Sequence, residues 1–198
     1  FNYTVFNSGS LSKYILRKVP YDFEYADIQA GIGTPHAVYA EFTADETLLV
    51  RAEAQALLGH YAEALEDLNT ELAAFSKDGV QLTLDDVKKF YSDDVTAYYT
   101  PEKPTPRKAF HTAFAISKDT EEPMLQCILH LRRIMTIHEG LRMQDVKRYG
   151  ITIYRRDVKS NYKITGITDT MEARDPRLAI QLPQDVITAG VTPNPRNK

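Results

Sequence analysis

The sequence has a single cysteine, no tryptophan and no long apolar run among its 198 residues. One cysteine excludes an internal disulfide, and Cys127 lies within an apolar helical pattern, so we expect a buried, unreactive thiol. No apolar stretch approaches the ~20 residues that a membrane-spanning helix needs, which argues against a helix that crosses a bilayer. The net charge of −3 predicts no general attraction to nucleic acid or to an anionic membrane.

Motifs of the common enzyme classes are also missing. There is no G-x-S-x-G, no Walker loop and no G-x-G-x-x-G, and the five histidines show no H-E-x-x-H spacing. His130 and His138 lie eight residues apart in an apolar pattern, which favours packing or boundary positions over metal binding. We therefore expect no metal and no cofactor. Paired carboxylates for glycoside hydrolysis stay open, because their separation is a property of the fold.

What the sequence does contain begins with a pair of helices over residues 44–75. Thr43 and Glu46 form a T-x-x-E capping box, and apolar residues then recur at helical spacing up to Gly59. A second amphipathic pattern starts two residues later, so the two helices must pack antiparallel. The segment from Leu58 to Leu65, L-G-H-Y-A-E-A-L, resembles the middle of a tetratricopeptide repeat, in which the glycine makes the corner.

The remaining chain predicts two further helical regions separated by loops. Thr83 and Asp86 open a short helix, and Asp119 or Thr120 caps a longer one whose apolar residues lie on more than one face. That distribution predicts a largely buried helix within residues 120–150. Residues 1–41 are interpreted as extended or looped structure, residues 96–106 as a proline-containing loop, and residues 151–198 as irregular C-terminal loops.

A ladder of charges follows the buried helix. Glu139, Arg142, Asp145 and Arg148 are three residues apart and alternate in sign, and Gly150 is placed where a helix ends. Residues at i and i+3 can touch on a helix, so the spacing predicts a helix with a series of ion pairs. A solvated charged surface is the alternative, and there each pair would contribute only about 0–1 kcal/mol.

Several short motifs occur in a characteristic order. They are R-A-E-A at 51–54, D-L-N at 67–69, L-R-R-I at 131–134, the charge ladder, D-P-R-L at 175–178, L-P-Q-D-V at 182–186 and N-P-R-N at 194–197. In this order the chain resembles the C-terminal half of the SusD/RagB family, the nutrient-binding outer-membrane lipoproteins of Bacteroidetes. The resemblance covers residues 40–198. Leu131, Met135 and Met143 depart from the family pattern, which has acidic residues at the first two positions and an aromatic at the third.

The resemblance implies a fold, a function and a partner. It implies an all-α, SusD-like fold of tetratricopeptide-like helix pairs with long irregular loops, in which residues 1–198 form one domain and the charge ladder is structural. It implies a non-enzymatic protein at the cell surface, held by a lipid anchor on a part of the protein outside this chain. The partner would be a SusC-like TonB-dependent transporter, and the ligand an oligosaccharide or, in RagB-like members, a peptide.

Tyrosines are the best candidates for ligand contacts, because aromatic faces stack on sugars and the chain has 12 tyrosines but no tryptophan. Tyr98 and Tyr99 lie beside the proline-containing loop, and Tyr154 and Tyr162 lie in the C-terminal region. Packing that tethers loops is the alternative role for each of them. Two other functions stay open: a tetratricopeptide-type scaffold that binds peptides, and a glycoside-acting enzyme.

Overall fold

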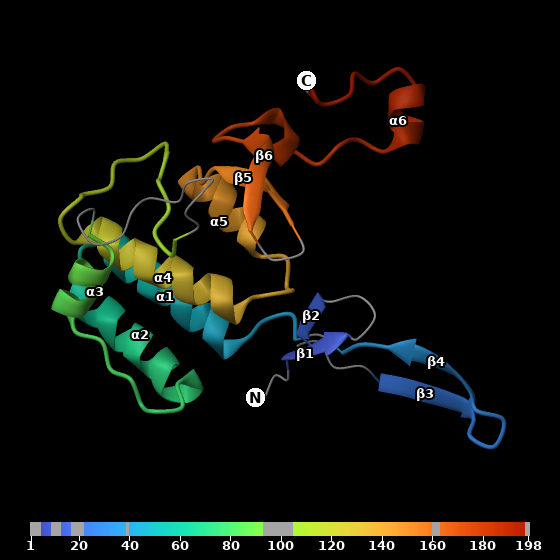
Figure 1. The fold of residues 1–198 in the computed structure, drawn as a ribbon, viewed down its shortest axis with the longest axis horizontal. Coiled ribbons are helices and arrows are strands. Elements are labelled where there is room, and N and C mark those ends of the chain that lie inside the picture. The colour runs from blue at the N-terminus through green and yellow to red at the C-terminus, as the bar shows by residue number, and fades with distance from the viewer. Residues whose placement is uncertain are drawn as a thin grey trace.

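A computed structural model describes residues 5–8, 13–16, 22–38, 40–92, 105–159 and 163–196. Its centre is a group of packed helices, with hairpins of β-strands at the edges (Figure 1). The helices of this group are α1 (Ala44–Leu57), α2 (Tyr61–Phe75), α3 (Leu84–Phe90), α4 (Glu121–Met135) and α5 (Arg142–Tyr149).

Helices α1 and α2 correspond to the pair predicted over residues 44–75. The Thr43 hydroxyl accepts a hydrogen bond from the Glu46 amide at 3.1 Å, which caps α1 as its sequence predicts. Gly59 turns the corner with φ of +80°, a backbone conformation that favours glycine. Ala52, Ala56 and Ala64 are fully buried, so small side chains let the two helices approach closely.

Helix α4 runs alongside α1 and supplies much of the core. Met124, Leu125 and Ile128 are fully buried, and Cys127 is buried as expected, with burial raising the pKa of its thiol to about 12. The prediction of a largely buried helix is confirmed over most of its length, and the exception is its C-terminal end, where Ile134 is 51% exposed. There α4 packs on α1 with one side only, and the other side faces solvent.

The predicted all-α fold class is wrong, because the described residues also form three antiparallel two-stranded sheets. Segments without helical periodicity satisfy their backbone groups by pairing with a neighbouring segment instead, which single-segment patterns do not reveal. The strands are β1 (Val5–Ser8) with β2 (Lys13–Leu16), β3 (Asp22–Asp27) with β4 (Ile32–His36), and β5 (Ile153–Val158) with β6 (Ile164–Met171).

The C-terminal region is not the irregular segment that its sequence suggested. Gly150 ends α5 in the left-handed conformation, and the chain then enters the β5–β6 hairpin. After β6 come a short 3₁₀ turn, Pro176–Leu178, and helix α6 (Gln184–Thr188). In the part of the chain that the structure describes, no helix is long and apolar enough to cross a membrane.

One buried carboxyl in the helix pair lacks a hydrogen bond. Glu71 on α2 is 3% exposed, and its Oε1 atom has no hydrogen-bond partner in the described structure. Burial, together with the negative charge of Asp45, raises the pKa of Glu71 from an ordinary 4.5 to about 7. Between about pH 4.5 and pH 7, Glu71 therefore stays protonated in the folded protein but is ionised in the unfolded chain.

A consequence is that stability should fall as the pH rises from about 4.5 to 7, because ionisation of Glu71 opposes folding. Glu71→Gln removes this titration, so we expect the variant to be more stable than the parent at pH 8 by about 1–2 kcal/mol, with little difference at pH 4. Urea denaturation over this pH range measures the effect. Glu66→Gln, at an exposed position of the same helix, is the control, and a parallel pH profile for Glu71→Gln and its parent would contradict the prediction.

Candidate ligand-binding site

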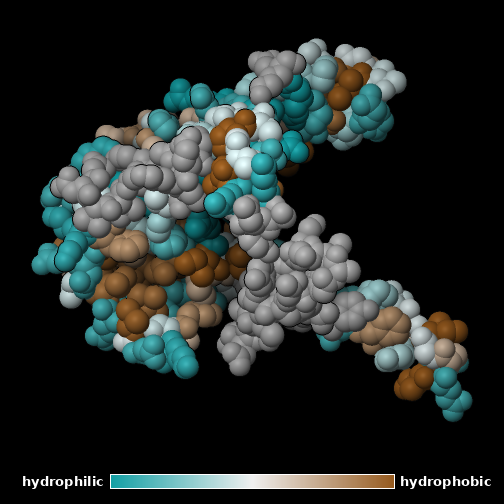
Figure 2. All heavy atoms as spheres, in the orientation of Figure 1, coloured by the Kyte–Doolittle hydropathy of each residue, from teal (hydrophilic) through white to brown (hydrophobic). Residues whose placement is uncertain are grey.

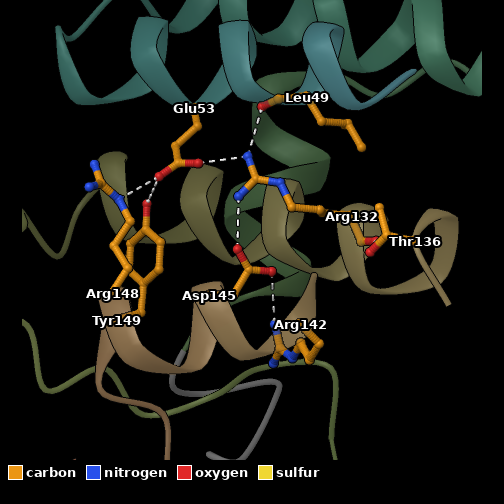
Figure 3. A network of polar contacts seen from close by, with 8 residues as sticks. All are labelled: Leu49, Glu53, Arg132, Thr136, Arg142, Asp145, Arg148 and Tyr149. Atoms are coloured by element: carbon orange, nitrogen blue, oxygen red, sulfur yellow. Dashed lines mark hydrogen bonds and ion pairs between the residues drawn. The ribbon is translucent and has the colours of Figure 1, made fainter. Parts of the chain in front are cut away.

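A buried group of charges fixes α5 against the other helices (Figure 3). The Arg132 guanidinium on α4 donates to Glu53 of α1 at 2.6 Å and to Asp145 of α5 at 2.9 Å, and it also reaches the carbonyl of Leu49 at 3.2 Å. One side chain thus connects three helices. Because its partners lie in the interior, these ion pairs are poorly screened by water.

Glu53 is the second centre of this group. It accepts hydrogen bonds from the Tyr149 hydroxyl at 2.6 Å and from Nε of Arg148 at 2.9 Å. Burial by itself would favour the neutral acid, but the Tyr149 hydrogen bond and the charge of Arg132 outweigh it and keep the pKa of Glu53 below its usual value. Glu53 is therefore ionised at neutral pH and holds α5 on α1.

The charges of the predicted ladder pair mainly with residues of other helices. Helix α5 begins at Arg142, so Glu139 lies in the exposed turn before it. Arg142 and Asp145 form an i, i+3 pair at 3.5 Å, whereas the shorter contacts of Asp145 and Arg148 go to α4 and α1. The alternating sequence therefore mainly ties α5 to its neighbours.

A segment between α3 and α4, residues 105–111, packs against α4 and the end of α5 and forms one wall of a cavity. Arg107 and Glu122, both almost fully buried, form an ion pair at 2.8 Å, and the amide of Lys108 donates to Gln126 at 2.9 Å. These contacts fasten residues 105–108 to α4. The amide of His111 then donates to the Tyr149 carbonyl at 2.8 Å, which places the segment beside the end of α5.

The cavity has a volume of about 560 Å³ and lies between residues 109–111, the start of β5 and the end of β6. This volume is within the range of about 300–1,000 Å³ that small-molecule sites occupy. It offers one aromatic ring and several hydrogen-bonding groups, contributed by His111, Thr152, Tyr154, Thr170 and Glu172. Such a lining suits a ligand with many hydroxyl groups, which both donate and accept hydrogen bonds.

The strand register explains how these side chains meet. Tyr154 of β5 lies directly opposite Thr170 of β6, so the two side chains project from the same face of the hairpin. The Arg156 guanidinium, two residues along the same face, sits 5.7 Å from the centre of the Tyr154 ring. The ring is half-buried, with enough surface left to line the cavity.

Arg177 stabilises the wall of the cavity that the end of β6 and the following turn form. Arg177 donates to the carboxylate of Asp175 at 2.9 Å and to the carbonyl of Thr170 at 2.6 Å, and it forms an ion pair with Asp169. Its hydrogen bonds lower the pKa of Asp175 to about 2. The turn at residues 172–175 is thereby fixed to the end of β6, which holds Glu172 at the rim of the cavity.

Of the four tyrosines that the sequence proposed as ligand contacts, Tyr154 lines this cavity. Tyr98, Tyr99 and Tyr162 lie outside the described residues. The sequence analysis missed His111, Thr152, Thr170 and Glu172. No local motif marks these four residues, because they come from segments that lie apart in the sequence and meet only in the folded chain.

The described residues contain no group of three or more His, Cys, Asp or Glu side chains arranged to hold a metal ion. Comparisons with protein-family models, with curated proteins and with solved structures gave no significant match.

Proposed function

We propose that this protein binds an oligosaccharide in the cavity beside Tyr154, without chemically changing it. The observation that carries the proposal is the lining itself: an aromatic ring next to two threonine hydroxyls, an imidazole and a carboxylate. Sugars combine apolar C–H faces, which stack on aromatic rings, with hydroxyl groups that need polar partners at the edge. A binding role rather than catalysis agrees with the absence of recognisable enzyme motifs in the sequence.

The cellular role that we propose rests on the sequence resemblance to the SusD/RagB family. In that role the protein captures nutrients at the outer-membrane surface and delivers them to a SusC-like TonB-dependent transporter. The motifs at residues 51–54, 131–134 and 182–186 support this proposal. The lipid anchor would belong to a part of the protein outside the 198 residues.

The site can be tested with substitutions at Tyr154. We expect Tyr154→Ala to weaken oligosaccharide binding about tenfold, equivalent to about 1.4 kcal/mol, because the stacking surface is lost. Tyr154→Phe keeps the ring and should bind nearly as well as the parent. Isothermal titration calorimetry against a panel of neutral and charged oligosaccharides, with peptides included, measures both variants.

Phe90→Ala is a matched control, because it removes an exposed aromatic ring from α3, away from the cavity. Binding of peptides but of no oligosaccharide would replace the proposed ligand class with the RagB-like one. Equal affinities for Tyr154→Ala and the parent would move the site elsewhere. Turnover of a bound oligosaccharide, seen as new reducing ends, would show a glycoside-acting enzyme instead.

A further inference from the structure

The hairpin of β3 and β4, with the residues after it up to Val38, forms an arm that points away from the helices (Figure 1). Most of its side chains are exposed, including large apolar ones: Tyr25 is 55%, Ile32 62% and Ile28 80% exposed. The brown spheres at its far end in Figure 2 mark this apolar tip. A two-stranded hairpin is at best marginally stable in water by itself, so such an arm gains much from a partner.

The arm is nevertheless well ordered internally. Oδ1 of Asp27 accepts hydrogen bonds from the amides of Gln29 and Ala30, and Gly31 completes the turn with φ of +66°. The Phe23 ring lies over Gly33, where a Cβ atom would come within 2.5 Å of it. A preformed arm of this kind loses little conformational entropy when it docks.

The arm is acidic, and another hairpin of the chain is its electrostatic complement. Within the arm, residues 22–38, the sequence has three acidic residues, Asp22, Glu24 and Asp27, and no Lys or Arg. The stretch of the β5–β6 hairpin, residues 153–171, has four Lys and Arg against two Asp. On β5 the exposed face carries Arg155, with Lys159 just past the strand end and Asp157 between them.

Each of the two hairpins also has a strand edge that pairs with no other described strand. Among the described strands, β3 pairs with β4 alone and β5 pairs with β6 alone. In Figure 1 the two hairpins lie apart, with β3–β4 directed away from β5–β6. Within one molecule, the opposite charges therefore do not meet.

We propose that the arm docks on the β5–β6 hairpin of a second copy of this chain, with β3 alongside β5. Main-chain hydrogen bonds would join the two hairpins into a four-stranded sheet, with Asp22 and Glu24 on the same face of the sheet as Arg155 and Lys159. Because each copy has one arm and one basic hairpin, reciprocal docking closes into a twofold dimer. This interface is independent of ligand binding beside Tyr154, whose side chain lies on the other face of β5 from Arg155.

Sedimentation velocity over a range of protein concentrations tests the dimer. We expect association that weakens as salt is raised, because the attraction between exposed charges is screened. Asp22→Lys combined with Glu24→Lys should weaken association at least about tenfold, and so should Arg155→Glu combined with Lys159→Glu. No residue of the arm belongs to the hydrophobic core, so far-UV circular dichroism should show folded variants.

Mixing the two double variants gives the decisive result. The arm that carries Asp22→Lys and Glu24→Lys is attracted to the β5 strand that carries Arg155→Glu and Lys159→Glu, and the two unaltered surfaces attract each other as in the parent. The mixture should therefore form a heterodimer although neither variant associates by itself. A parent protein that stays monomeric at every concentration would overturn the proposal. A dimer that both double variants leave unchanged, or a mixture that fails to associate, would overturn it as well.

Discussion

Arg132→Met is expected to lower the free energy of unfolding by about 3–5 kcal/mol, which is a large share of the stability of a small domain. Arg132 holds Glu53 and Asp145 together between three helices, and both carboxylates are mostly buried. Methionine fills similar space but supplies no charge. The carboxylates would then repel each other in an environment of low polarity, with Arg148, Tyr149 and Arg142 as their remaining partners.

Arg133→Met provides the matched control for this experiment. Arg133 is the next residue of α4 but is exposed, so its loss should change stability by less than about 1 kcal/mol. Urea denaturation followed by circular dichroism measures both variants. Equal losses for the two substitutions would mean that the buried charges contribute nothing beyond an ordinary surface arginine.

Gly150→Ala is expected to have the second large effect, because two costs combine at this position. Gly150 has φ of +61°, where a side chain costs about 1–2 kcal/mol. A Cβ atom there would also lie 2.3 Å from the carbonyl oxygen of His111, which must then move. Such overpacking typically adds about 1–3 kcal/mol. Since His111 lines the cavity, oligosaccharide affinity should fall together with stability.

Gly140→Ala separates the cost of a side chain in the left-handed backbone conformation from the cost of steric overlap. Gly140 has φ of +79°, but no atom lies within 4 Å of where its Cβ would be. This variant should lose only about 1–2 kcal/mol and bind ligand normally. Thermal unfolding and calorimetric titration of both variants give the comparison, and similar results for the two glycines would contradict a role for the contact between Gly150 and His111.

The helical part of the molecule follows closely from local sequence patterns. The Thr43 cap, the corner at Gly59, the capping box at Thr83 and the end of α5 at Gly150 all depend on interactions within a few residues. Interactions of that range can be predicted from the sequence, because the residues that make them are close together in it. The burial of Cys127 likewise follows from its position in an apolar helical pattern.

The strands were missed for the opposite reason. β3, β4, β5 and β6 are short, and each is stabilised by hydrogen bonds to another segment rather than by its own composition. The all-α prediction left residues 1–41 as extended or looped structure and residues 151–198 as irregular loops, because helical periodicity is absent from both. The cavity beside Tyr154 could not be predicted from the sequence for the same reason, since it exists only where β5, β6 and residues 109–111 come together.

The charge ladder shows most clearly which features the sequence determines and which depend on tertiary packing. Its alternating spacing indicated that these residues form ion pairs, and helix α5 indeed carries Arg142, Asp145 and Arg148. Which charges pair was decided by packing, because Arg132 and Glu53 reach Asp145 and Arg148 from helices distant in sequence. The sequence by itself therefore determined the start of α1, the corner at Gly59, the start of α3 and the end of α5, through contacts between near neighbours. The tertiary structure decided the ion-pair partners, the sheets and the cavity, because each depends on segments that meet only after the chain has folded.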